Sequence, residues 1–196
     1  MKKVYLSVLA IVGLFTGSAF ALETTQLAQD IMLNELQASI MTEMHVANVI
    51  NWKVGEYQEY EISASFGNLG NVKKTVASEK DNAIWVNSDM SGGMIGEHKA
   101  EALIDRATGK LLELRQDGKK QEIPNDKIEI INQEATKITV PAGTFDVIHI
   151  TAKSEKIKKL DVWANPRDIT MDGTAQMELD SGMLPMTLKL TKFGGR

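Results

Sequence analysis

The segment 136–153, TKITVPAGTFDVIHITAK, has the clearest pattern of apolar and polar positions in the chain. Ile138 and Val140 alternate with polar residues, as in a half-buried strand. The sequence Pro-Ala-Gly at 141–143 interrupts this alternation, because proline fixes φ and glycine allows positive φ. Residues 145–152 then carry apolar side chains on much of both faces. The pattern predicts two strands joined by a tight corner, with the second strand in the centre of a sheet.

Short alternating segments separated by turn residues continue from about residue 56 to about residue 193. Turn signals such as Asp117-Gly118 recur roughly every ten residues, as in hairpins. The segment 67–71, GNLGN, predicts a turn, and the polar segment 72–79 predicts a strand near an edge of the sheet. The segment 127–133 predicts a further strand, separate from the one at 136–140. Together, these segments predict a mainly antiparallel sheet of about nine to eleven strands, which curls because strands twist.

Residues 24–50 have a different period. Met32, Leu36, Ile40 and Met44 recur every four residues, and no glycine or proline interrupts the segment. This spacing predicts one long N-terminal amphipathic helix with a methionine-rich face, and the fold class is therefore α+β. The apolar face either packs on the sheet as ordinary core or acts as a movable plug or lipid-contacting surface. Methionine suits both roles, because its flexible thioether side chain fills irregular space.

A signal-peptide pattern precedes the predicted helix. It consists of the basic start MKK, an apolar run at 4–15 and a small-x-small site that ends at Ala21. The apolar run is too short to span a bilayer comfortably, although a retained membrane anchor is the alternative. We expect cleavage near Ala21, a periplasmic or secreted location and a single mature domain at 22–196. The chain has no cysteine, which excludes disulfide bonds, thiolate chemistry and lipid attachment at a cysteine.

The charge of the chain argues against nucleic-acid binding. The net charge is −4, and the loss of Lys2 and Lys3 with the signal peptide makes it more negative. Lysines are dispersed along the sequence, whereas nucleic-acid binding requires a clustered basic surface. A mature domain of this length can bury a core without metal or disulfide bonds.

The sequence contains little that points to catalysis. None of the three histidines, His45, His98 and His149, has a second histidine or carboxylate at the spacing of a metal-ligand set. His149 alternates with apolar residues, which favours a hydrogen-bonded core histidine. Glu59 and Glu61 share a strand face, as paired catalytic carboxylates can, but a solvated face is the simpler interpretation. No nucleophile elbow, zinc-protease motif or P-loop occurs. We therefore expect no enzymatic activity, no metal and no cofactor.

A curled sheet has a concave apolar side that needs a cover. The predicted helix is one cover, and the glycine-rich segment 91–96, SGGMIG, is another, either as a mobile flap or as a tip buried in the core. If these segments fill the concave side only in part, an apolar cleft remains that suits acyl chains; if they fill it fully, the core is closed. The candidate lining residues are Met32, Leu36, Ile40, Met44, Trp52, Phe66, Trp85, Met94, Ile95, Phe145 and Trp163.

The order of signal peptide, helix and antiparallel meander resembles the LolA/LolB-like superfamily of periplasmic lipoprotein carriers, which are half-barrels. The segment 140–145, VPAGTF, is similar to a corner in related exported bacterial proteins, where a tryptophan-bearing strand and a last strand follow. Here 161–164 (DVWA) and 186–193 take those places. The resemblance implies a half-barrel that holds a lipid, an acyl chain or a lipidated protein without catalysis. Since the apolar run belongs to the predicted signal peptide, we expect no transmembrane segment in the mature form. The alternative is an envelope interaction or scaffold module with a closed core and a protein partner.

Overall fold

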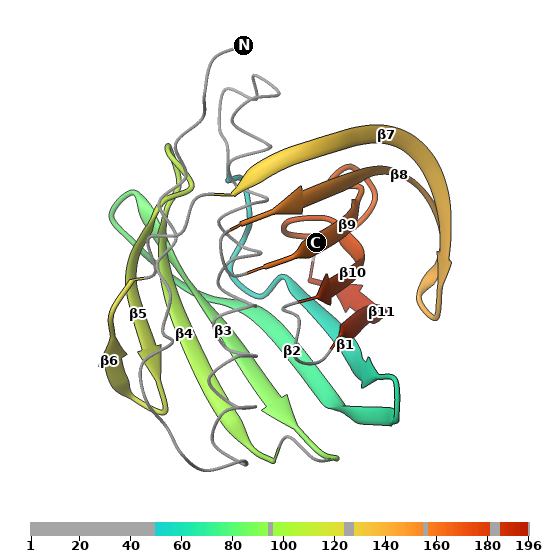
Figure 1. Ribbon diagram of the computed structural model, residues 1–196. Coiled ribbons are helices and arrows are strands. Elements are labelled where there is room, and N and C mark those ends of the chain that lie inside the picture. Colours follow the sequence, from blue (N-terminus) through green and yellow to red (C-terminus); the bar gives the residue numbers. More distant parts are fainter. Residues whose placement is uncertain (1–49, 94–95, 124–127, 155–156, 181–184, 196) are drawn as a thin grey trace.

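A computed structural model describes residues 50–93, 96–123, 128–154, 157–180 and 185–195. The described residues form one antiparallel sheet of eleven strands and no helix (Figure 1). The predicted signal peptide and all but the last residue of the predicted helix lie outside the described residues. Within the described ranges, no helix is long and apolar enough to cross a membrane.

The eleven strands follow one another along the chain with short connections. They are β1 (Tyr57–Ala64), β2 (Gly67–Lys80), β3 (Ala83–Ser91), β4 (His98–Asp105), β5 (Leu111–Gln116), β6 (Lys119–Gln121), β7 (Glu129–Val140), β8 (Gly143–Lys153), β9 (Lys159–Ala164), β10 (Thr174–Asp180) and β11 (Met186–Gly194).

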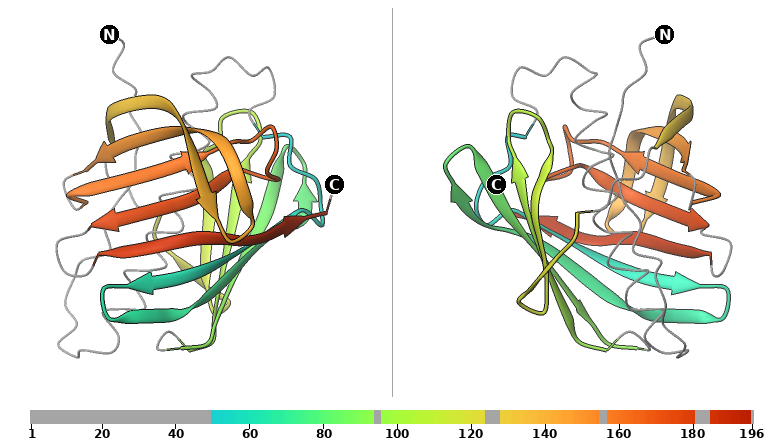
Figure 2. Two further views of the ribbon diagram at one scale, coloured as in Figure 1. Left: turned by 90° about the vertical axis from the view of Figure 1, so that its right-hand side faces the viewer. Right: turned by 60° about the vertical axis from the view of Figure 1, so that its left-hand side comes forward.

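Two meanders make up the sheet, and they join where the first strand pairs with the last. The strand order is β6-β5-β4-β3-β2-β1-β11-β10-β9-β8-β7, and Ile62 of β1 lies opposite Leu188 of β11. The sheet curls, so that the strands of the two meanders run at a steep angle to each other (Figure 2). The predicted curled, mainly antiparallel sheet and its number of strands are confirmed.

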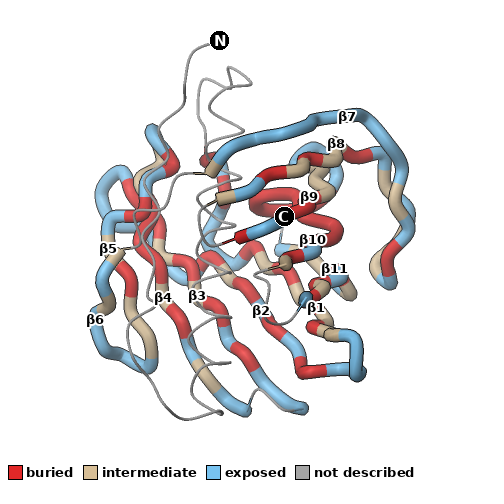
Figure 3. The backbone as a smooth tube through the Cα atoms, viewed as in Figure 1, coloured by how far each residue is buried: buried red, intermediate tan, exposed pale blue. Residues whose placement is uncertain are grey.

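The two faces of the sheet differ sharply in character. Buried and more exposed positions alternate along the strands, as expected for a period of two (Figure 3). On β3, Ile84 and Val86 are buried, whereas Trp85 and Asn87 on the opposite face are partly exposed. The register continues the buried set across both meanders into one core cluster. We call this surface the apolar face and the other the polar face. The apolar face includes Tyr60, Ile62, Val72, Val76, Ile84, Val86, Ala102, Ile104, Leu114, Ile150, Leu160, Val162, Met177, Leu188 and Leu190.

Two sequence predictions about β2 are wrong. The predicted turn at 67–71 is the first part of the strand, because β1 and β2 are joined by a shorter turn in which Ala64 pairs with Gly67. The strand also lies between β1 and β3 and not near an edge. Its polar appearance arises because alternate residues such as Lys73 project from the polar face, where Lys73 pairs with Glu59 at 3.2 Å.

The corner between β7 and β8 is confirmed, but β8 lies next to the edge strand β7 and not in the centre of the sheet. The segments 127–133 and 136–140 do not form separate strands, since β7 runs through both with a register shift at Ile131. At the corner, the Ala142 N–H donates a 3.0 Å hydrogen bond to the carbonyl of Leu190 on β11. The corner is therefore anchored to the last strand.

Candidate functional site

Residues 165–173 form the loop that connects β9 to β10, and the second part of this loop, residues 169–173, is buried. Its first turn is held by Asn165, whose Oδ1 accepts hydrogen bonds from the N–H groups of Arg167 at 3.0 Å and Asp168 at 3.1 Å. Gly173 closes the loop with φ +77°, and a Cβ there would lie 2.3 Å from the backbone nitrogen of Pro166. Glycine is thus required at this position both by its φ and by the close approach of the backbone.

This loop brings polar groups against β1 inside the protein. Gln58 donates from Nε2 to the carbonyl of Thr170 at 2.8 Å and to Asp172 Oδ1 at 2.9 Å. The Thr174 N–H also donates to Asp172 Oδ1, at 3.0 Å, and the Tyr60 hydroxyl donates to the Thr174 carbonyl at 3.1 Å. All five residues are buried. We call them the interior polar cluster.

Three oxygens of the interior polar cluster are unsatisfied. Gln58 Oε1, Asp172 Oδ2 and Thr174 Oγ1 are buried and have no hydrogen-bond partner among the described residues. A buried polar atom without a partner costs about 1–3 kcal/mol, so groups of this kind are uncommon in folded proteins and point to a bound water or ligand. Beside them, Lys74 pairs in register with Gln58, is 1% exposed and places its Nζ 5.5 Å from the centroid of the Tyr60 ring.

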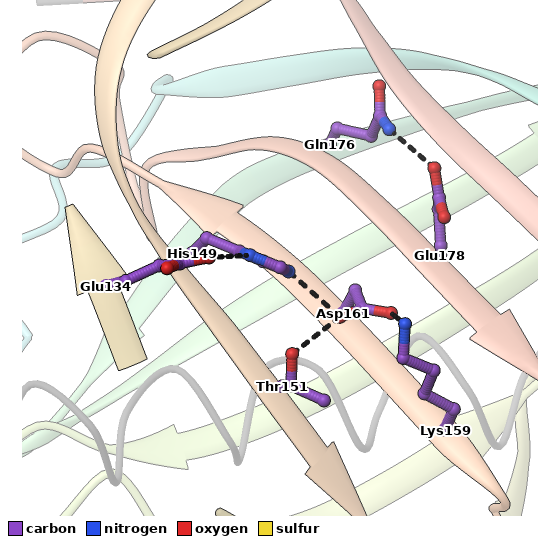
Figure 4. A network of polar contacts seen from close by, with 7 residues as sticks. All are labelled: Glu134, His149, Thr151, Lys159, Asp161, Gln176 and Glu178. Carbon is purple, nitrogen blue, oxygen red and sulfur yellow. Dashed lines mark hydrogen bonds and ion pairs between the residues drawn. The ribbon is translucent and has the colours of Figure 1, made fainter. Parts of the chain in front are cut away.

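A second polar group, the outer network, lies on the polar face around Asp161 (Figure 4). Asp161 Oδ1 accepts hydrogen bonds from His149 Nε2 at 2.9 Å and from Thr151 Oγ1 at 2.7 Å, and Oδ2 pairs with Lys159 Nζ at 2.7 Å. Burial raises the pKa of the Asp161 carboxyl, but the hydrogen bonds from Lys159, Thr151 and His149 outweigh it and hold the pKa below its ordinary value.

Both ring nitrogens and the ring face of His149 contact other residues of this part of the sheet. Its Nδ1 lies 3.3 Å from Glu134 Oε1, its Nε2 contacts Asp161, and its ring stacks on Trp163 with centroids 4.3 Å apart. Carboxylates only accept hydrogen bonds, so both contacts are hydrogen bonds when both ring nitrogens carry protons. The hydrogen bonding predicted for His149 is confirmed, but the prediction that it belongs to the core is wrong, because His149 projects from the polar face and is only half-buried. With its two ring nitrogens facing Glu134 on β7 and Asp161 on β9, His149 of β8 joins the three strands.

A shallow hollow of about 120 Å³ adjoins the outer network. Its lining includes Lys159, Asp161, Glu178 and Thr187, together with Pro185. Typical ligand pockets are several times larger and mostly apolar. This hollow therefore does not provide the apolar cleft expected from the sequence.

The described members of the predicted lining set do not meet at one place. Trp85 projects from the polar face, where the Arg115 guanidinium lies 4.6 Å from its ring centroid. Trp163 lies on the polar face against His149. Phe145 packs edge-to-face on Phe193 at 6.0 Å beside the corner of β7 and β8.

Two further members lie away from these. Phe66 is 56% exposed at the turn between β1 and β2. Trp52 is buried before β1, and its carbonyl accepts a 2.9 Å hydrogen bond from Arg106 Nη2. The remaining members, which lie outside the described residues, are Met32, Leu36, Ile40, Met44, Met94 and Ile95.

The interior polar cluster is not among the sites predicted from the sequence, although the sequence carries a signal for it. Gln58 shares the buried face of β1 with Tyr60 and Ile62, and Lys74 shares that of β2 with Val72. A glutamine and a lysine on the apolar side of alternating strands break the pattern and mark positions where a polar partner is needed. In the described part of the chain, no group of three or more histidines or carboxylates is placed to hold a metal ion.

No protein-family model and no curated protein matches the sequence. Among solved structures, the hypothetical protein CT021 from Chlamydia trachomatis is similar with a TM-score of 0.49 at 7% identity, over 74% of this chain and 88% of that chain. A Bacteroides fragilis protein described as exported and of YmcC-like fold has a TM-score of 0.45 at 12% identity, over 76% of this chain and 100% of that chain. MucB has a TM-score of 0.40 at 10% identity, over 85% of this chain and 57% of that chain. The resemblance to the LolA/LolB superfamily itself stays a prediction.

Proposed function

We propose that the protein is exported and binds a hydrophobic, lipid-like ligand or a lipidated protein on its apolar face, without catalysing a reaction. The observation that carries this proposal is the apolar face itself, which is continuous across both meanders of a single curled sheet. All described strands belong to that one sheet, so no second layer of strands packs against its apolar face. An acyl chain and an amphipathic helix are both suited to such a surface.

The export part of the proposal comes from the sequence. A basic start, an apolar run and a small-x-small site at 19–21 form a signal-peptide pattern. The predicted helix at 24–50 would then follow the cleavage site directly, with its methionine-rich stripe available to share the apolar face with the ligand.

Uptake of a fluorescent fatty acid by the delipidated, processed protein tests this proposal. We expect saturable binding at micromolar protein. Val86→Thr places a hydroxyl in the middle of the apolar face at nearly constant volume and should weaken binding several-fold. Thr75→Val makes the inverse change on the polar face of the neighbouring strand β2 and should leave binding unchanged. A signal that does not saturate, or that both variants reduce equally, would contradict the proposal.

A second candidate function is an envelope interaction module with a closed core. The edge strand β7 favours it, because this 12-residue strand is exposed over most of its length and carries Ile130 at 38% and Ile131 at 55% exposure. Exposed edge strands are sites where another chain can add a strand. In that case, a cross-linker placed on β7 should capture a protein partner, and the fluorescent fatty acid should not bind.

A further inference from the structure

We infer that the interior polar cluster binds a neutral hydroxyl group, and that the ligand of the apolar face is therefore an amphiphile with a hydroxyl head. This inference rests on the proposed function, because it assigns the polar end of the same ligand. The binding groups are the buried, unsatisfied oxygens of three of the five cluster residues, Gln58, Asp172 and Thr174.

The cluster lies on the same side of the sheet as the apolar face. Gln58 alternates with Tyr60 and Ile62 on β1, so all three side chains project from the same side of the sheet. The side chain of Asp172 is brought to that side by its hydrogen bond from Gln58 Nε2. A chain lying along the apolar face can thus place its head group at these oxygens.

The three oxygens lie close together. Gln58 Nε2 and the Thr174 N–H both donate to Asp172 Oδ1, at 2.9 and 3.0 Å. The covalent geometry of each side chain then keeps all three unsatisfied oxygens within about 6 Å of that atom. A head group that binds at Asp172 therefore lies in the neighbourhood of all three.

The chemistry of these atoms selects a hydrogen-bond donor. Gln58 Oε1 and an ionised Asp172 Oδ2 only accept hydrogen bonds, whereas the Thr174 hydroxyl both donates and accepts. A hydroxyl group matches this set, because it can donate to an acceptor and accept from Thr174. A carboxylate or phosphate head offers only acceptors and would also be repelled by Asp172.

Lys74 argues against a cationic head. It lies opposite Gln58 in the register of β1 and β2 and is almost fully buried, so its ammonium group is on the same side of the sheet as the cluster. A second cation brought near it would pay for desolvation and like-charge repulsion together. A neutral hydroxyl group avoids both the desolvation cost and the repulsion.

Competition between three amphiphiles of equal chain length tests the inference. Dodecanol, dodecanoate and methyl dodecanoate are each used to displace N-phenylnaphthylamine from the delipidated protein. We expect dodecanol to displace the probe at roughly fivefold lower concentration than either of the others, as one additional net hydrogen bond predicts. Thr174→Val, which removes one of the three oxygens at constant shape, should abolish that preference and leave the affinity for methyl dodecanoate unchanged.

Thr191→Val is the matched control, since the Thr191 hydroxyl donates to the carbonyl of Glu59 outside the cluster. It should retain the preference for dodecanol. Asp172→Asn provides a second variant should Thr174→Val fail to fold, and it too should lose the preference. Equal affinity of the wild type for all three compounds would overturn the inference, leave the proposed function standing and indicate that the oxygens bind water alone. A preference that both cluster variants retain would also overturn it. If none of the compounds displaces the probe, the proposed function fails as well.

Discussion

Replacing Asp161 by asparagine removes one negative charge from the outer network at constant shape. The Asp161 side chain is 4% exposed and is held by His149 Nε2 at 2.9 Å, Thr151 Oγ1 at 2.7 Å and Lys159 Nζ at 2.7 Å. Asparagine keeps one acceptor oxygen but turns an amide donor toward one of these three donors. The substitution therefore breaks at least one charged hydrogen bond inside the sheet.

The size of the effect follows from the exposure of each partner. A hydrogen bond to a charged group contributes about 1.5–3 kcal/mol when shielded from solvent. Lys159 is 60% exposed, so water screens its share and we assign it less than 1 kcal/mol. His149 is 17% exposed and keeps most of its contribution. We expect Asp161→Asn to lower the free energy of unfolding by about 2–3 kcal/mol at neutral pH.

Urea unfolding followed by tryptophan fluorescence at several pH values measures this loss in the free energy of unfolding. The pKa of Asp161 in the folded protein lies below its ordinary value of 3.8. The stabilisation is therefore fully present above that value and is lost as the pH falls through the lowered pKa. The stability difference between wild type and Asp161→Asn should shrink below about pH 4.

Glu134→Gln is the matched control, because Glu134 contacts the other nitrogen of the same histidine but is 59% exposed. It should cost less than about 1 kcal/mol. An equal cost for the two variants, or a cost of Asp161→Asn that does not depend on pH, would refute the account of the outer network.

Two further predictions concern the backbone. Arg106→Ala should lower the free energy of unfolding by about 1–3 kcal/mol in a urea titration, because Arg106 donates to the carbonyls of Ile50 at 3.0 Å and Trp52 at 2.9 Å; an unchanged midpoint would show that the segment before β1 is held by other contacts. Gly173→Ala should cost several kcal/mol more than Gly118→Ala in thermal unfolding. Both glycines have positive φ, +77° and +76°, but a Cβ would meet backbone only at Gly173 and has open space at Gly118; equal losses would contradict the close packing of the loop.

The sequence alone predicted the strands in which apolar and polar residues alternate with a simple period. The alternation at 138–140 and the Pro-Ala-Gly corner predicted the hairpin of β7 and β8, because a two-residue period and a turn signal are local properties. The same local reasoning placed β2 at an edge. Lysines such as Lys73 suggested an edge strand, yet an exposed lysine needs only a solvated face, and a central strand of a one-layer sheet also has one.

The candidate site was harder to predict, because it depends on distant pairings. The sequence grouped Trp85, Trp163 and Phe145 as lining residues by their aromatic character. The register of β3 and β9 places the two tryptophans on the polar face, where Arg115 and His149 cover their rings. Likewise, Gln58 meets Asp172 across 114 positions of the chain, a contact that no local pattern reveals.

Photo-cross-linking shows whether a lipid-like ligand binds at the apolar face. The delipidated protein is incubated with a fatty acid that carries a diazirine at the end of its acyl chain, irradiated and analysed by peptide mass spectrometry. The account predicts labels on strands that form the apolar face, at positions such as Val86, Val162 and Met177. Labels confined to polar-face positions such as Trp85 and Trp163, or no labelling above that of a non-binding control protein, would contradict it.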